Sequence, residues 1–115
     1  MSITIYHNPR CSKSRQTLQL IEESGQSPKI VEYLKTPPTA VELKEITQLL
    51  GISPRALLRT KEAEYMAHGL DDMALDDNAI IEIMVNHPKL IERPIVINGQ
   101  QAVIGRPPEN VLELI

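Results

Sequence analysis

The chain has 115 residues, which is the length of one folded domain, and we predict a single domain over residues 1–115. Its formal net charge of −3 argues against a nucleic-acid-binding protein, because phosphate backbones select basic surfaces. The longest apolar runs are too short to span a bilayer, and the N-terminus lacks a basic, apolar leader. We therefore expect a cytoplasmic protein that binds neither membranes nor nucleic acid. Because the chain contains no Trp and no Phe, its core is expected to be aliphatic.

The first third of the chain has the pattern of a β-α-β unit. Residues 2–6 carry β-branched residues in alternation and predict a strand. Residues 12–24 have apolar residues at helical spacing, and residues 29–34 predict a second strand. A helix that connects two strands of one sheet places them parallel, with a right-handed crossover.

The residues between the second and third strands predict an all-helical insert. Thr39-Ala40-Val41-Glu42 has the spacing of a capping box and begins a helix that ends at Gly51. A short helix follows Ser53, with Arg55 and Arg59 expected on one of its faces. Two further helices are predicted, over residues 62–68 and from Asp76 or Asp77 to Asn86.

The end of the chain predicts a hairpin and a helix. Residues 94–97 and 101–104 predict antiparallel strands, joined by the two-residue turn Asn98-Gly99. Pro107-Pro108 opens a last helix, which continues to the end of the chain. The order β-α-β, helical insert, β-β-α predicts a thioredoxin-like α/β fold with a small mixed four-stranded sheet.

Cys11 lies between the end of a predicted strand and the start of a helix. The free N–H groups of a helix start and the positive end of its dipole stabilise a thiolate, and the same turn suits a tetrahedral oxyanion. Ser14 is expected to turn its hydroxyl toward the sulfur, and His7 to lend a further positive charge. A buried core cysteine gains nothing from this setting, so we predict a reactive thiol. Three cations also lie close in sequence: Arg10, Lys13 and Arg15.

Three arginines elsewhere are candidates for an anion site. Arg59 ends a short predicted helix, while Arg93 and Arg106 each precede a proline at the start of an element. A surface arginine is usually solvated, and spacing alone does not bring these residues to Cys11. Together they would form an anion clamp, because the planar guanidinium fork matches the oxygens of an oxyanion. The histidines have no metal-ligand spacing, so no metal site is predicted.

Cys11 is the only cysteine in the chain, which excludes a disulfide within it and fits a reducing compartment. Any second thiol that Cys11 needs must therefore come from another molecule.

The stretch from Tyr6 to Arg15 resembles the active-site signature of the glutaredoxin-dependent arsenate reductases. The pattern is Tyr-His-Asn-Pro-x-Cys-x-x-Ser-Arg, and the similarity continues over essentially the whole chain. The resemblance implies a thioredoxin-like fold and the reduction of arsenate to arsenite through a covalent cysteine–arsenate intermediate. It implies glutathione as co-substrate, glutaredoxin as partner and no bound cofactor. The further matching segments are Pro37-Pro38, residues 51–53 and 55–59, His87-Pro88, residues 93–96 and Arg106-Pro107.

The resemblance also implies a role for each site residue. Cys11 is the nucleophile, and Pro94 is the cis-proline that lies beside the reactive thiol. The residues implied to tune or support the Cys11 thiolate are His7, Ser14 and Arg15. The residues implied to bind the arsenate and arsenite oxygens are Arg59, Arg93 and Arg106.

Two alternative functions remain open on the sequence. Cys11-Ser12-Lys13-Ser14 has the Cys-x-x-Ser form of a monothiol glutaredoxin-like thiol exchanger, which a deglutathionylation assay would detect. Relatives of this fold also bind RNA polymerase as non-enzymatic stress regulators, which a polymerase pull-down would detect. Because Ser14 stands where such a redox switch has its second cysteine, a disulfide switch within one chain is impossible.

Overall fold

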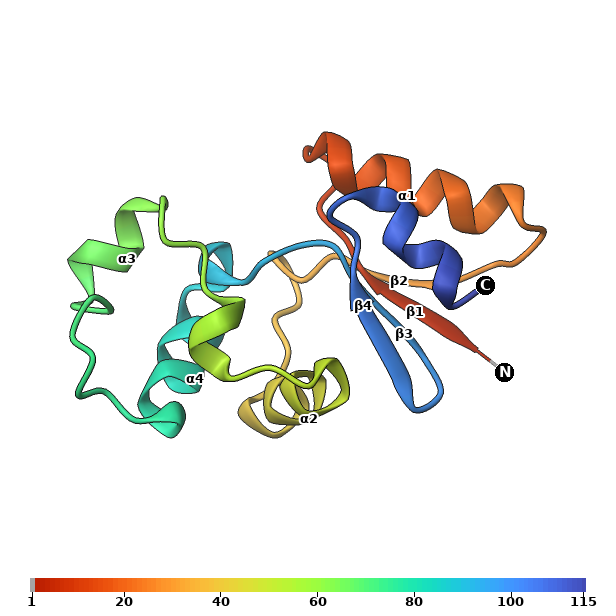
Figure 1. Cartoon of the computed structure of the whole chain (residues 1–115). Coiled ribbons are helices and arrows are strands. Elements are labelled where there is room, and N and C mark those ends of the chain that lie inside the picture. Colours follow the sequence, from red (N-terminus) through yellow and green to blue (C-terminus); the bar gives the residue numbers. More distant parts are fainter. Residues whose placement is uncertain (1) are drawn as a thin grey trace. The chain divides into compact units, whose positions relative to one another are not determined.

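The computed structural model describes residues 2–115, which form two compact units that we describe separately (Figure 1). Unit 1 contains the chain up to Thr36 and from Arg93 to Ile115, and unit 2 contains Pro37–Glu92. The prediction of one domain over residues 1–115 stays a prediction. No helix in residues 2–115 is both long enough and apolar enough to cross a membrane.

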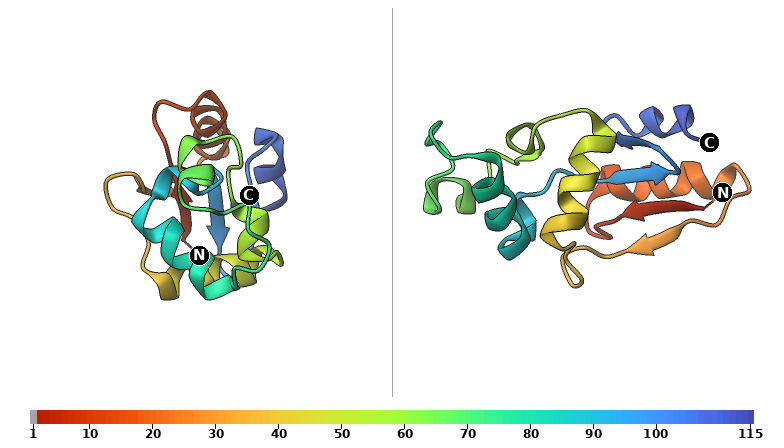
Figure 2. Two further views of the ribbon diagram at one scale, coloured as in Figure 1. Left: turned by 90° about the vertical axis from the view of Figure 1, so that its left-hand side faces the viewer. Right: turned by 90° about the horizontal axis from the view of Figure 1, so that it is seen from below.

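Unit 1 is a four-stranded sheet with its strands in the order β2-β1-β3-β4. β1 pairs in parallel with β2 and antiparallel with β3, and β3 pairs antiparallel with β4. Figure 2 shows these strands lying alongside one another in the sheet. This topology confirms the predicted thioredoxin-like fold. The elements are β1 (Ile3–Tyr6), α1 (Ser12–Glu23), β2 (Lys29–Val31), β3 (Ile95–Asn98), β4 (Gln101–Ile104) and the 3₁₀ helix η3 (Pro108–Glu113).

Two elements of unit 1 and its hairpin turn differ from their predictions. Asn98 pairs with Gln101, so the two-residue turn is Gly99-Gln100 and not Asn98-Gly99. β2 ends at Val31 rather than at residue 34, because the chain turns there and the amides of Lys35 and Thr36 both donate to the Glu32 carbonyl at 2.9 Å. The last helix is a 3₁₀ helix rather than an α-helix. An apolar spacing predicts that a segment is helical, but it does not separate these two hydrogen-bond patterns.

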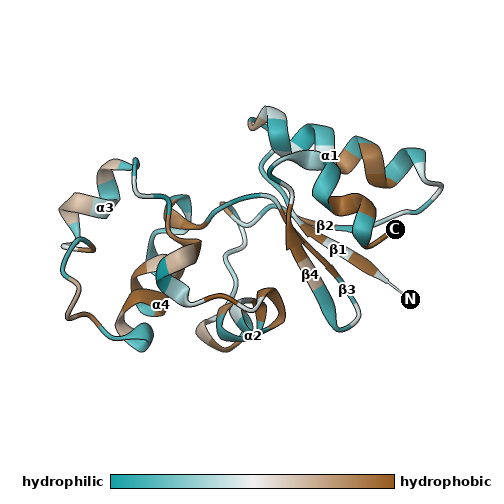
Figure 3. Ribbon diagram, viewed as in Figure 1, coloured by the Kyte–Doolittle hydropathy of each residue, from teal (hydrophilic) through white to brown (hydrophobic). Residues whose placement is uncertain are grey.

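α1 and η3 pack on one face of the sheet (Figure 1). Their contact with β1 and β3 forms an aliphatic core, as the composition predicted, and Figure 3 shows apolar residues along these elements. Burial of each Ile, Leu or Val side chain contributes about 1.5–3 kcal/mol. The buried members of this core are Ile3, Ile5, Ile21, Val96, Val111 and Leu114.

Unit 2 is the predicted helical insert. The capping box at the start of its first helix is present, with Thr39 and Glu42 exchanging hydrogen bonds of 3.1 Å, and Gly51 ends that helix with a left-handed φ of 70°. Asp76 caps the last α-helix through the amide of Ala79 at 2.8 Å. The elements are α2 (Ala40–Leu50), the 3₁₀ helix η1 (Pro54–Leu57), α3 (Ala63–Ala67), α4 (Asp77–Asn86) and the 3₁₀ helix η2 (Pro88–Leu90).

The prediction that Arg55 and Arg59 share a helical face is wrong. η1 ends at Leu57, and from there the chain pairs with the segment that leads to Glu92. The amide of Arg59 donates to the Leu90 carbonyl at 2.8 Å, which takes this residue off the helix. Helical spacing beyond a helix end carries no information on which side chains are neighbours.

Four chain segments of unit 1 meet at one edge of the sheet. β1 and β2 are parallel, so both end at this edge, whereas the antiparallel strand β3 begins there and β4 ends there. The edge therefore carries the loop of residues 7–11 after β1, which we call the Cys11 loop, with residues 32–35 on its β2 side. Arg93 and Arg106 lie on its other side, because Arg93 precedes β3 and Arg106 follows β4.

Candidate active site

Cys11 is the N-cap residue of α1, as the sequence predicted. Its backbone is extended, its amide donates to the Asn8 carbonyl at 3.0 Å, and its carbonyl accepts from the amide of Arg15 at 3.0 Å. The residue is buried, with 9% of its surface exposed, and it is not a member of the aliphatic core that α1 and η3 form with the sheet. α1 is 12 residues long, and its N-terminal amides and dipole favour negative charge at this position.

Arg106 places its guanidinium next to the sulfur of Cys11. Its Nη1 atom lies 3.8 Å from Cys11 Sγ and also donates to the Arg93 carbonyl oxygen at 3.4 Å. The two residues are 95 positions apart in the sequence, so the sheet and not a local motif brings them together. A fixed cation at this distance stabilises a thiolate.

Arg93 and Arg106 each precede a proline in a cis peptide bond. The cis bonds are Arg93–Pro94, for which the resemblance implied this isomer, and Arg106–Pro107, which was not predicted to be cis. The Nε and Nη1 atoms of Arg93 are buried, and its carbonyl anchors Arg106. Both arginines therefore lie at the sheet edge that carries Cys11.

Gly105 allows the end of β4 to approach α1 closely. A Cβ atom at this position would lie 2.5 Å from Oγ1 of Thr17 and 2.8 Å from Cγ of Pro94. Thr17 is fully buried, and its hydroxyl lies 3.4 Å from the Gly105 carbonyl. Because Arg106 follows Gly105 directly, this contact determines the position of the backbone from which the Arg106 side chain extends.

We expect Gly105→Ala to lower the free energy of unfolding by about 1–3 kcal/mol, because the added methyl must displace Thr17 or Pro94. Chemical denaturation measures this loss. Gln100→Ala, at an exposed position of the same hairpin, is the matched control and should change stability little. If the denaturation midpoint of Gly105→Ala is unaltered, there is more space between Gly105 and the side chains of Thr17 and Pro94 than these distances indicate.

His7 and Ser14 form a pair beneath the Cys11 loop, which corrects two expectations. His7 Nδ1 lies 2.6 Å from Ser14 Oγ, and the amide of Asn8 donates to the same hydroxyl at 3.0 Å. The Ser14 hydroxyl therefore holds the β1 end of the loop and is not turned toward the sulfur. Desolvation by burial lowers the pKa of His7, so the neutral imidazole is favoured and lends no positive charge.

The lowered pKa of His7 predicts a loss of stability in acid. Above the ordinary value of 6.5 the imidazole is neutral in both states and contributes nothing to the pH dependence. As the pH falls below this value, the unfolded chain takes up a proton that the folded chain resists. The free energy of unfolding therefore falls until the pH reaches the lowered pKa of the folded state.

We expect the wild type to lose more stability than His7→Asn when the pH is taken from about 7.5 to about 5. The asparagine amide replaces the Nδ1 position without a titratable group. Urea unfolding of both proteins at the two pH values measures the difference. Equal losses would mean that His7 has the same pKa in the folded and unfolded chain.

Comparison with known proteins decides the family. The sequence matches the model of the ArsC family over residues 6–114.

The chain belongs to the ArsC family.

Its similarity to other members of the ArsC family extends over almost the full length of the chain. A protein named arsenate reductase from Haemophilus influenzae is 48% identical over 116 residues and covers 100% of both chains. The arsenate reductase of Escherichia coli K12 is 46% identical, and the match covers 99% of this chain and 81% of that one. A solved structure of an arsenate reductase from Vibrio cholerae is 52% identical, with a TM-score of 0.97 and coverage of 100% of this chain and 98% of that one.

Arg15 in this ArsC-family chain contacts the loop and not the sulfur. Its Nη1 atom donates to the Pro9 carbonyl oxygen at 2.9 Å, which ties the first turn of α1 to the segment before Cys11. Its positive charge also acts on His7, where it lowers the pKa further, although less than burial does. We infer that Arg15 shapes the loop that carries the thiol.

Arg59 belongs to unit 2, where two carboxylates contact its guanidinium. Nη1 lies 3.0 Å from Oε1 of Glu62, and Nε lies 3.7 Å from Oε1 of Glu92. Its role as a ligand of an oxyanion stays a prediction. Among residues 2–115, no group of three or more His, Cys, Asp and Glu side chains is placed to hold a metal ion.

Gly105 and Thr17 contribute to the site, although they were not among the residues predicted for it. A glycine directly before Arg106-Pro107 was the available signal, since glycine at the end of a strand often marks a close approach of two backbones. Residues 32–35 gave no such signal, and residues 32–34 were predicted to belong to a strand. The turn at Glu32 brings these residues to the sheet edge instead.

Proposed function

We propose that this chain reduces arsenate to arsenite, with Cys11 as the nucleophile. The observation that carries the proposal is the position of the Cys11 sulfur, at the N-terminus of α1 and 3.8 Å from the Arg106 guanidinium. This setting favours a thiolate and an oxyanion at the same place. The similarity to proteins named arsenate reductase supports the choice of arsenic as the reacting atom.

The first step is the binding of arsenate by Arg93 and Arg106. Each charge-assisted hydrogen bond from a guanidinium contributes about 1.5–3 kcal/mol. The Cys11 thiolate then attacks the arsenic atom, a sulfur–arsenic bond forms, and one oxygen leaves as water after it is protonated. Arsenic remains pentavalent in this step, because the sulfur supplies the electron pair of the new bond.

The reduction itself requires two thiols from outside the chain, since Cys11 is its only cysteine. Glutathione adds to the arsenic atom of the Cys11 adduct, with loss of a second water. Glutaredoxin then attacks the glutathione sulfur, a disulfide forms, and the electron pair of the broken sulfur–arsenic bond stays on arsenic, which becomes trivalent. Water releases arsenite and returns the Cys11 thiol. In sum, one arsenate and two thiols give one arsenite, one disulfide and one water.

The remaining residues named above act on the Cys11 loop or on the substrate. The His7–Ser14 pair and the Arg15 contact with Pro9 hold the loop in the shape that places the thiol at the helix start. Arg59 is proposed as a third ligand of the substrate oxygens. We place the reaction in the cytoplasm, because the external thiols have to be kept reduced.

The decisive experiment is the formation of arsenite from arsenate by the purified chain. We expect full activity with glutathione and glutaredoxin together, and loss of turnover when either is omitted. A deglutathionylation assay on the same preparation tests the thiol exchanger. Rapid deglutathionylation without arsenite formation would overturn the proposal in favour of that alternative.

A further inference from the structure

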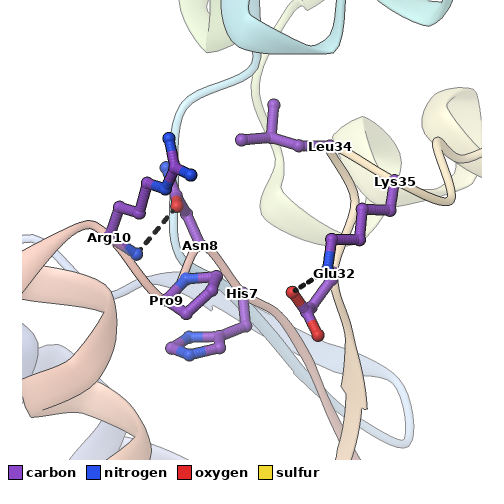
Figure 4. Close-up of a pocket in the computed structure, with 7 residues that line it drawn as sticks. All are labelled: His7, Asn8, Pro9, Arg10, Glu32, Leu34 and Lys35. Atoms are coloured by element: carbon purple, nitrogen blue, oxygen red, sulfur yellow. Dashed lines mark hydrogen bonds and ion pairs between the residues drawn. The ribbon is translucent and has the colours of Figure 1, made fainter.

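The Cys11 loop has a cavity on the side away from Arg93 and Arg106. It lies between residues 7–10 and residues 32–35, has a volume of about 290 Å³, and is drawn in Figure 4. This volume is close to the lower end of the range of small-ligand sites, about 300–1,000 Å³. The lining residues are His7, Asn8, Pro9, Arg10, Glu32, Leu34 and Lys35.

The position of the cavity suits a second reactant. The order β2-β1-β3-β4 places the Cys11 loop between the arginines on one side and the cavity on the other. Arg10, which lines the cavity, directly precedes Cys11 in the chain. A molecule in the cavity would therefore lie beside the loop that carries Cys11, on the side that Arg93 and Arg106 do not occupy.

The charges of the cavity are mixed, which excludes a simple oxyanion as its ligand. Figure 4 shows Arg10 on one wall, with Glu32 and Lys35 on the other. Lys35 Nζ lies 3.6 Å from Glu32 Oε1, and the two side chains are 80% and 44% exposed. An exposed ion pair of this kind contributes little, so a ligand exchanges with it at low cost. The Glu32 carboxylate repels an arsenate ion but attracts an ammonium group.

The backbone of the Cys11 loop has its donors already engaged. The amide of Asn8 donates to Ser14, the amide of Arg10 donates to the Asn8 side chain at 3.0 Å, and the amide of Cys11 donates to the Asn8 carbonyl. Recognition in the cavity therefore depends on its side chains. Two cations, one carboxylate and the apolar surfaces of Pro9 and Leu34 are available for this.

We propose that this cavity binds the glutathione that the reaction consumes. Glutathione has two carboxylates, one ammonium group and a thiol, which match the two cations and the one carboxylate of the cavity. Arg10 and Lys35 bind the carboxylates, and Glu32 binds the ammonium group. The inference rests on the proposed function, because it names the site of that reaction's thiol co-substrate.

The test is direct binding of S-methylglutathione, which has no free thiol, to the full chain by calorimetry. We expect Arg10→Ala/Lys35→Ala to weaken this binding at least tenfold. Glutathione diethyl ester, whose carboxylates are masked, should bind both proteins equally weakly. Lys29→Ala removes an exposed cation at the start of β2 that does not line the cavity, and it should keep wild-type affinity.

Steady-state kinetics provides the second measurement. The double variant should raise KM for glutathione about tenfold and leave KM for arsenate unchanged. Wild-type binding and KM in the double variant would overturn the site, even if arsenate is reduced. Weakened binding of S-methylglutathione, with no arsenate reduction by the wild type, would keep the site and overturn the proposed function. The two substituted side chains, Arg10 and Lys35, are exposed, and unfolding midpoints check that the variants fold.

Discussion

Replacing Cys11 with serine should abolish arsenate reduction while the chain remains folded. A serine hydroxyl is far less ionised than a thiol, and it does not form the sulfur–arsenic bond on which the reaction depends. The loss of a nucleophile lowers kcat by at least about 10³-fold. Because Cys11 lies in a loop at a helix start and outside the aliphatic core, we expect an unfolding midpoint close to that of the wild type. Arsenite formation and chemical denaturation measure the two effects.

A double variant tests whether the position of the thiol matters. Cys11→Ser/Ser12→Cys keeps one cysteine but moves it to the next residue, which is exposed. The new thiol no longer has the contact that places Arg106 Nη1 3.8 Å from the sulfur. We expect no recovery of activity. Recovery would mean that any thiol at this helix start suffices and that the Arg106 contact contributes nothing.

The local features of the fold are those that the sequence predicted well. The capping box at Thr39 and Glu42 and the cap at Asp76 depend on residues within a few positions of one another, and so does the hairpin turn, which lies one residue later than predicted. Cys11 belongs to the same group, because a break after one strand and the start of a helix determine its position. Local sequence patterns of this kind can be identified without knowledge of the tertiary structure.

The features that the sequence missed depend on burial or on distant contacts. The charge of His7 could not be predicted, because its pKa is determined mainly by how deeply the fold buries the ring. Arg106 reaches Cys11 across 95 positions, and no spacing rule connects them. The family resemblance implied that Arg106 binds the substrate oxygens, but not that it contacts the sulfur. The close approach at Gly105 likewise depends on Thr17 and Pro94, which lie in two other segments.

We expect Arg106 to have two separable effects on the site, and two substitutions distinguish them. Arg106→Ala removes both the charge near the Cys11 sulfur and the guanidinium fork for the substrate. We expect kcat/KM for arsenate to fall by about 10²–10³-fold, as on removal of an oxyanion ligand. We also expect Cys11 to react several-fold more slowly with iodoacetamide at neutral pH, because the thiolate loses the cation 3.8 Å away.

Arg106→Lys keeps the charge but loses the planar fork. We expect near wild-type alkylation of Cys11 in this variant, with KM for arsenate raised about tenfold because the bidentate contact is lost. Lys29→Ala, which removes a distant exposed cation, controls for net charge and should behave as the wild type in both assays. If Cys11 is alkylated as slowly in Arg106→Lys as in Arg106→Ala, the guanidinium acts on the sulfur through its hydrogen bond rather than through its charge. If neither variant changes alkylation, the helix start alone activates Cys11, and Arg106 serves the substrate only.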